Sequence, residues 1–249
     1  MTVVTTTRSR PARAKPFAWS YSKIKNFDSC PKRYWHIDVN KDIKEEESEN
    51  LKQGNLLHDA AAKRIDAGKP LPATTVYREE LEAWCQKILV GHANTKAFEA
   101  AHPQAKMLVE QKLAITESFG PTTWFGTDAA PAWFRGIGDV IKVVGPVALI
   151  IDWKTGKIVE DSQQLALMAA CVFAHHPEVQ RVRSQFIWLK EDAESRADYS
   201  RADMPKMWAG ILPKVHTLKH AHENTLFPAK PGALCRRWCP VHVCPHHGE

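Results

Sequence analysis

The 249-residue chain has no long apolar run, and this absence excludes a membrane-spanning helix. No stretch approaches the roughly 20 consecutive apolar residues that a helix needs to cross a bilayer. Residues 1–16 lack the apolar centre of a secretory signal and carry Arg8, Arg10, Arg13 and Lys15 among Thr, Pro and Ala. We therefore expect a cytoplasmic protein of a bacterial or phage-infected cell, without membrane association. Its first 16 residues are expected to be a disordered basic tail, the alternative being an arm that touches nucleic acid.

The chain also lacks internal repeats, low-complexity blocks and the Gly-x-x-x-x-Gly-Lys-[Ser/Thr] phosphate loop, so it carries no ATP-driven motor of that kind. Without an export signal, its six cysteines favour metal binding or buried thiols over disulfides. The length and 44% hydrophobic content suit a soluble protein with a large core, and we expect one domain over residues 17–249. A net charge of +6 favours a polyanionic partner without proving one.

The spacing of apolar residues predicts an α/β protein whose carboxylates lie on strands. The expected order is helices, three strands, a helix, a strand and a helix, with the charged run Lys41–Asn50 as an exposed loop or helix edge. The expected helices are one capped by Ser20 or Ser22 and ending near Cys30-Pro31, then Asn55–Ala67, Glu79–Ala97 and Gln163–His175. The expected strand regions are Met107–Thr116 continuing into Trp124-Phe125-Gly126, a hairpin over Arg135–Gly156, and Val182–Leu189, with the remainder helical as far as His222 before a cysteine-rich tail.

The segment Arg135–Gly156 predicts a β-hairpin that brings two carboxylates together. Two β-branched runs flank Gly145-Pro146, a turn dipeptide. If these two residues alone form the loop, Asp139 lies directly opposite Asp152, with Cβ atoms roughly 4.5–5.5 Å apart. Like charges among apolar residues are costly to bury, and a divalent cation between them would remove the conflict. Lys154 projects from the same face as Asp152. A bulge near the turn would instead move the two carboxylates apart.

These residues resemble a known family. Asp139 followed by Asp152-Trp153-Lys154 resembles the PD-(D/E)XK nuclease superfamily, and Asp-Trp-Lys-Thr-Gly looks like its RecB-type branch. The resemblance runs from about residue 18 to residue 246. One position departs, because Met168 stands where the family usually has an aromatic residue four positions after a helical glutamine. The other matching segments are Ser20-Tyr21-Ser22-Lys23-Ile24 through Phe27 with Cys30-Pro31, Gly54-Asn55-Leu56-Leu57-His58, Gly136-Ile137-Gly138-Asp139, and Gln164.

The resemblance implies a restriction-endonuclease-like core, in which a central mixed β-sheet is flanked by helices. It implies a Mg²⁺- or Mn²⁺-dependent deoxyribonuclease, and we expect an exonuclease that acts on DNA ends or single strands. Recombination, repair, and phage or CRISPR DNA processing would suit such an enzyme, and any helicase would be a separate partner. The alternatives are a structure-specific endonuclease and a non-catalytic DNA-binding subunit with a nuclease fold.

Within the family chemistry, Asp139 and Asp152 hold the divalent cation, because hard cations prefer oxygen ligands. Lys154 would orient the attacking water or stabilise the charge that develops on the phosphate. The competing interpretation of Asp152 and Lys154 is an ion pair at the end of a strand. The apolar context and the opposed Asp139 argue against it.

Three further side chains are candidates for the same site. His58 is expected to be a metal ligand, which would favour Mn²⁺ somewhat, although an isolated helical histidine is usually structural. Glu110 could reach the metal from its strand or face solvent. Gln164 is expected to hydrogen-bond near the lysine or a phosphate, or else to cap its helix. Thr155 and Lys157 are candidates for phosphate contacts only.

The cysteines suggest a second cofactor. Cys30 with Cys235, Cys239 and Cys244 resembles the one-plus-three pattern of RecB-like, AddB-like and CRISPR-associated iron–sulfur nucleases, in which a [4Fe–4S] cluster joins the two ends of the domain. The segment 235–246 would then belong to the nuclease domain. Structural Zn²⁺ is the alternative, with His242, His246 or His247 as substitutes. Cys85 and Cys171 lie in apolar helical stretches and are expected in the core. The insert Arg236-Arg237-Trp238 suits a DNA backbone with a stacked base, or a tryptophan that braces the cluster.

Overall fold

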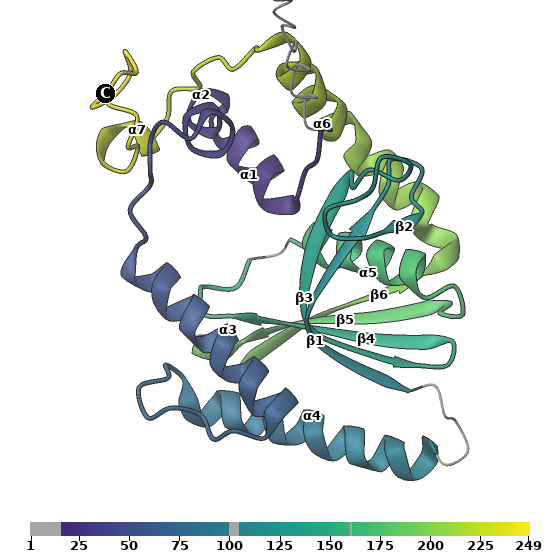
Figure 1. Ribbon diagram of the computed structural model, residues 1–249. Helices are drawn as coiled ribbons and strands as arrows, with labels where there is room; N and C mark the ends of the chain where they lie inside the picture. Colours follow the sequence, from purple (N-terminus) through teal and green to yellow (C-terminus); the bar gives the residue numbers. More distant parts are fainter. Residues whose placement is uncertain (1–15, 100–104, 160) are drawn as a thin grey trace, which may run out of the picture.

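A six-stranded mixed β-sheet forms the centre of the computed structural model, which describes residues 16–99, 105–159 and 161–249 (Figure 1). The strand order is β2-β1-β3-β4-β5-β6, in which only β4 and β5 are parallel neighbours. The basic tail predicted over residues 1–16 lies outside the described residues except for Pro16. The strands are β1 Lys106–Ile115, β2 Pro121–Thr122, β3 Phe134–Val144, β4 Val147–Lys154, β5 Arg181–Trp188 and β6 Ala193–Ser200.

Helices cover both faces of the sheet (Figure 1). On one face, α1, α5 and α6 pack with the sheet around residues such as Trp19, Leu167 and Trp208, and we call this the α5-side core. On the other face, α3 and α4 pack around Leu57 and Leu81, and we call this the α3-side core. Because the central strands are buried on both faces, they are almost continuously apolar. The helices are α1 Tyr21–Ser29, α2 Pro31–Tyr34, η1 Trp35–Asn40, α3 Glu49–Ala67, α4 Arg78–Glu99, α5 Gln163–His175, η2 Leu189–Glu191, η3 Arg201–Asp203, α6 Met204–Asn224 and α7 Leu234–Arg237.

The hairpin of β3 and β4 has the predicted two-residue turn. Val144 pairs with Val147, and the same register continues without a bulge to Val140 and Ile151. Gly145 has a φ of 52°, a left-handed conformation that glycine adopts without strain and that tight hairpin turns need. The recorded pairing ends one position before Asp139 and Asp152, which would form the next pair in this register.

A change of face in β1 and β3 was not foreseen. In β1, Val109 packs with the α3-side core, whereas Leu113 packs with the α5-side core, although strict alternation would put both on one face. In β3, Phe134 belongs to the α5-side core and Val140 to the α3-side core. Both strands therefore change face at the same level of the sheet. Glu110 lies at this level with a φ of 47°, which is a strained conformation for a residue other than glycine.

Three predicted boundaries were wrong. β6 was expected to be helical, but its residues pair along their whole length with β5, and this tertiary pairing outweighs the weak strand propensity of an edge sequence rich in charge. Residues 124–126 form a turn rather than a strand. Helix α3 begins at Glu49, six residues before the predicted Asn55, because Ser48 accepts a hydrogen bond from the Leu51 backbone N–H (3.2 Å) and caps it.

No helix among the described residues is long and apolar enough to span a membrane.

Candidate active site

A histidine and two carboxylates meet where β1 and β3 change face. His58 comes from α3, Glu110 from β1 and Asp139 from β3, and one ligand atom of each lies within 4.8 Å of the others. The His58 Nδ1 atom is 3.2 Å from Asp139 Oδ2 and 4.0 Å from Glu110 Oε1. This group brings together three of the four side chains that the sequence proposes as metal ligands. Among the described residues, no other group of three histidine, cysteine or acidic side chains meets the same distance limit.

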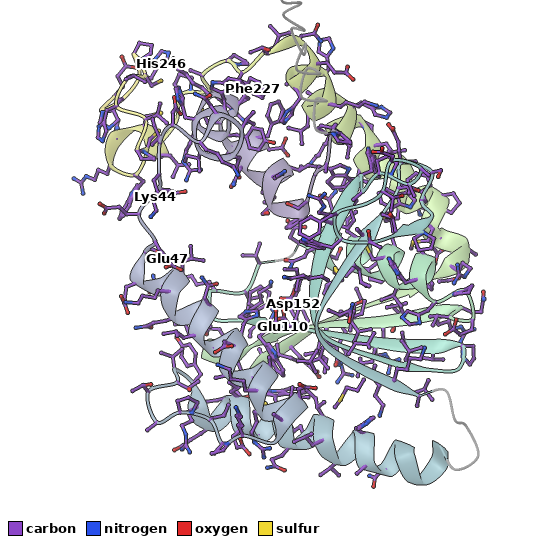
Figure 2. The ribbon with its side chains drawn as sticks, in the orientation of Figure 1. Lys44, Glu47, Glu110, Asp152, Phe227 and His246 are labelled. Carbon is purple, nitrogen blue, oxygen red and sulfur yellow. The ribbon has the colours of Figure 1, made fainter. Side chains whose placement is uncertain are left out.

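The fourth proposed ligand, Asp152, belongs to an adjoining network. Gln164 Nε2 donates to Asp152 Oδ2 (2.7 Å), and Lys154 Nζ donates to Gln164 Oε1 (3.2 Å) and forms an ion pair with Asp152. Lys154 Nζ also lies 4.8 Å from the ring centroid of Phe186. Gln164 at the start of α5 therefore fixes the position of both the acid and the lysine of β4. Figure 2 labels Asp152, and it also labels Glu110 of the neighbouring group.

Backbone geometry holds Asp139 at the junction of the two groups. The Trp153 backbone N–H donates to Asp139 Oδ2 (2.8 Å), so this carboxylate reaches across to β4 just beyond the end of the ladder. Gly54 lies next to Thr155, since a Cβ atom on Gly54 would be 3.6 Å from Thr155 Oγ1. The close approach of α3 to the end of β4 places His58, one turn further along α3, over the acids.

The site carries an excess of buried negative charge. Asp139 and Asp152 are only 6% and 4% exposed. Burial raises the pKa of Asp152 to about 6, with a further contribution from Asp139 that Lys154 only partly offsets. Burial and Asp139 also raise the pKa of Glu110. Burial lowers the pKa of His58, but the surrounding carboxylates outweigh it and the net shift is upward. Three carboxylates and an imidazole fit a divalent cation such as Mg²⁺ or Mn²⁺.

The structure accounts for the departure at Met168. A Cβ atom on Gly136 would lie 2.5 Å from Met168 Sδ, and one on Gly138 would lie 3.2 Å from Met168 Cε. Met168 is buried against these two glycines of β3, immediately before Asp139. The sequence shows the two glycines and the methionine separately, and their packing was not inferred from it.

The cysteines fall into the two predicted groups. Cys85 and Cys171 are fully buried in the core, and burial raises the pKa of both thiols, so they remain protonated and are poor ligands. The other four cysteines, all partly exposed and free of disulfides, line one small cavity together with Lys32, Arg33, Lys230 and His246. The four are Cys30, Cys235, Cys239 and Cys244.

Backbone contacts bring the two ends of the chain together at this cavity. Lys32 N donates to Pro228 O (3.1 Å), and Lys230 Nζ donates to Asp28 O (2.6 Å). Figure 1 shows α7 and the C-terminus beside α2. Among the described residues at this cavity, no three histidine, cysteine or acidic side chains have ligand atoms within 4.8 Å of one another.

The remaining candidates are peripheral. Trp238 is 74% exposed, so it does not brace the cysteine cavity from a buried position. Lys157 is exposed, and Thr155 is half-buried against α3.

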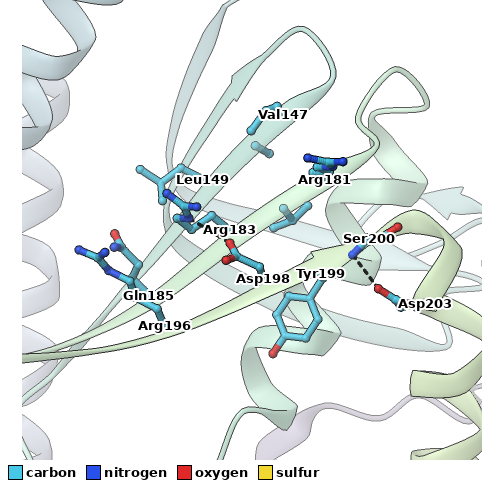
Figure 3. Close-up of a pocket in the computed structure, with 12 residues that line it drawn as sticks. Val147, Leu149, Arg181, Arg183, Gln185, Arg196, Asp198, Tyr199, Ser200 and Asp203 are labelled. Carbon is cyan, nitrogen blue, oxygen red and sulfur yellow. Dashed lines mark hydrogen bonds and ion pairs between the residues drawn. The ribbon is translucent and has the colours of Figure 1, made fainter.

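A larger cavity lies on the α3 side of the sheet, at the opposite end of β4 from Lys154 (Figure 3). Its volume is about 780 Å³, and Arg181, Arg183 and Arg196 line it. Arg183 forms an ion pair with Asp198 (3.0 Å). Because this cavity contains none of the metal-ligand candidates, size alone does not identify the active site.

The chain was compared with curated protein sequences, solved structures and protein-family profiles. No curated protein sequence matches the chain. Among solved structures, a candidate exonuclease from Eubacterium rectale is 12% identical over 88% of this chain and 85% of its own, with a TM-score of 0.47. The protein SSO0001 is 12% identical over 90% of this chain and 94% of its own, with a TM-score of 0.28. These low scores carry no argument about function. The family profile of the PD-(D/E)XK nuclease superfamily matches residues 18–245, and the chain belongs to this superfamily.

Proposed function

We propose that the protein is a Mg²⁺- or Mn²⁺-dependent deoxyribonuclease that degrades DNA as an exonuclease, from ends or along single strands. The observation that carries the proposal is the junction of two groups on neighbouring strands. His58, Glu110 and Asp139 offer metal ligands, and the Asp152–Lys154–Gln164 network adjoins them. Because the chain belongs to a nuclease superfamily, hydrolysis of a phosphodiester bond is the reaction that we propose for these residues.

In this proposal the cation is held by Asp139 and Asp152, with His58 and Glu110 completing the set. When bound, the cation supplies positive charge that polarises the scissile phosphate and makes water a better nucleophile. The Lys154 ammonium donates to the attacking water or to the phosphate oxygen on which charge develops. The Gln164 side chain accepts a hydrogen bond from Lys154 through its carbonyl oxygen and donates one to Asp152 through its amide nitrogen. Both side chains are therefore pre-organised for the reaction.

The test is digestion of end-labelled linear DNA and covalently closed circular DNA with Mn²⁺ or Mg²⁺, beside the Lys154→Ala and Asp152→Ala variants. We expect loss of the linear substrate, an intact circle, and no cleavage by either variant. A nicked or linearised circle would favour the endonuclease alternative. Intact linear single- and double-stranded DNA would refute the enzymatic proposal and leave a DNA-binding subunit, and activity that survives Asp152→Ala would refute the site.

We further propose that residues 17–249 form one nuclease domain in which a [4Fe–4S] cluster joins the segment 235–246 to Cys30, with Zn²⁺ as the alternative cofactor. The cavity that the four thiols share supports a common cofactor at this position. Lys32, Arg33 and Lys230 line the same cavity and would offset the negative charge of four thiolates. Anaerobically purified protein should be brown and contain iron and acid-labile sulfide, which Cys239→Ser loses and Cys85→Ala keeps. Colourless protein with stoichiometric zinc would refute the cluster.

A further inference from the structure

A second concave feature opens beside the candidate catalytic network. It has a volume of about 490 Å³ and lies between the start of α1, the loop that follows β2, and the first half of β3. Gln164 lines this cavity and also contacts Asp152 and Lys154. A group bound in the cavity would therefore lie next to a phosphate held at the active site.

The charge of the cavity suits an anion. Lys23 and Arg135 line it, and among the described residues no aspartate or glutamate does. The Arg135 Nε atom is buried without a hydrogen-bond partner. Burial lowers the pKa of Lys23, Asp38 partly opposes this shift, and the positive charge of Arg135 adds to it. A phosphate placed between Lys23 and Arg135 would relieve the repulsion between their positive charges and occupy the Arg135 donors. Ser20 begins α1 at the same wall, and helix N-termini also favour anions.

The cavity also offers an aromatic surface. Trp124 contributes a half-exposed indole ring, and the Arg135 guanidinium lies 5.8 Å from its centroid. An arginine beside a tryptophan ring is typical of sites that stack a nucleic-acid base and neutralise its phosphate. The Tyr21 hydroxyl lies at the same wall and donates its hydrogen bond to Asp161, so it does not donate to a ligand in the cavity.

Size decides between single and paired nucleotides. A volume of about 490 Å³ falls in the range that encloses one compact ligand, and a double helix cannot enter it. We infer that this cavity binds one unpaired nucleotide next to the scissile phosphate, stacked on Trp124 with its phosphate on Arg135 and Lys23, so that the enzyme selects single-stranded DNA. The inference rests on the proposed function for the identity of the ligand.

Binding without divalent cation tests the inference separately from cleavage. Fluorescence anisotropy in EDTA would compare a labelled oligothymidylate with a blunt duplex of the same length. We expect the single strand to bind more tightly. Trp124→Ala should weaken it about 5- to 150-fold, since stacking on one aromatic side chain is worth about 1–3 kcal/mol. Arg135→Gln should weaken binding and reduce the slope of log K against log salt by about 0.7.

Two matched controls separate the cavity from exposed side chains in general. Phe125, 84% exposed and outside the cavity, controls for Trp124, and Arg196, paired with Glu194 on β6, controls for Arg135. Phe125→Ala and Arg196→Gln should change binding of the single strand less than about twofold. If Trp124→Ala does not fold, two other variants test the inference. Trp124→Phe should keep most of the affinity for the single strand, and Arg135→Gln should weaken it.

The two proposals can fail independently. Unchanged binding by Trp124→Ala and Arg135→Gln in a protein that cleaves DNA would overturn the inference alone, as would equal losses for the duplex and the single strand. Trp124-dependent binding of the single strand without any cleavage would uphold the cavity and overturn the nuclease.

Discussion

Replacing Asp152 by asparagine should stabilise the cation-free protein at neutral pH. Burial raises the pKa of Asp152 from 3.8 to about 6, so the folded protein holds this proton more tightly than the unfolded chain does. Stability therefore falls as the pH rises from 3.8 to about 6 and then levels off. Each pKa unit corresponds to about 1.36 kcal/mol, so ionised Asp152 destabilises the fold by about 3 kcal/mol. Asparagine keeps the shape and carries no charge, so it removes most of this penalty, less the cost of losing one of the two oxygens that face Gln164 and Lys154.

The assay is denaturant unfolding of wild type and Asp152→Asn in EDTA over a range of pH. The variant's advantage should be absent below pH 3.8, grow toward about pH 6 and then stay constant. Adding Mn²⁺ at neutral pH should stabilise wild type by about 2.7 kcal/mol at one hundred times its Kd, and the variant by less. Asp59→Asn, at an aspartate whose side chain is 59% exposed, is the control and should change stability by less than about 0.5 kcal/mol. If Asp152→Asn is less stable than wild type at neutral pH without metal, the description of the site as an unbalanced negative cluster is wrong.

Three other variants separate the parts of the site. Gln164→Ala should lower the cleavage rate by about tenfold or more, because it frees Lys154. It should leave Mn²⁺-induced stabilisation nearly intact, because Gln164 is not a metal ligand. Equal losses in both assays would contradict the assignment of Gln164 to positioning rather than to metal binding. His58→Ala should raise the Mn²⁺ concentration needed for stabilisation by more than about tenfold, as measured by thermal shift, and an unchanged titration would exclude His58 as a ligand. Gly136→Ala should destabilise the protein by about 1–3 kcal/mol, because its Cβ meets the Met168 sulfur, and Met168→Ala in the same chain should recover part of that loss; additive losses would show that the two residues are not coupled.

The hairpin was predictable because local chemistry determines it. Gly145-Pro146 sets a two-residue turn, and the turn sets the register of β3 and β4 as far as Val140 and Ile151, the neighbours of the two aspartates. Helix α5 was predicted to the residue, since its apolar run is long and ends in turn residues. In both cases the deciding interactions are close together in the sequence.

The missed features depend on contacts between distant segments. The β6 strand alternates Glu194, Arg196 and Asp198 on one face, a weak period-two signal that becomes a strand only beside β5. The meeting of His58 with Glu110 and Asp139 was proposed from the family resemblance, and the change of face that produces it left no signal that we recognised. The strained φ of Glu110 is imposed by packing on both sides of the sheet rather than by its own residue type.

The change of face in β1 and β3 sets the proposed cation site between two helical layers. His58 belongs to the helical layer built on the α3-side core, whereas Gln164 belongs to the layer built on the α5-side core. The strands between them pass from one core to the other at the level of the acids. A cation shared by His58 and the carboxylates would link the α3 layer directly to these strands, so its removal should be felt first in the packing of α3 against the site.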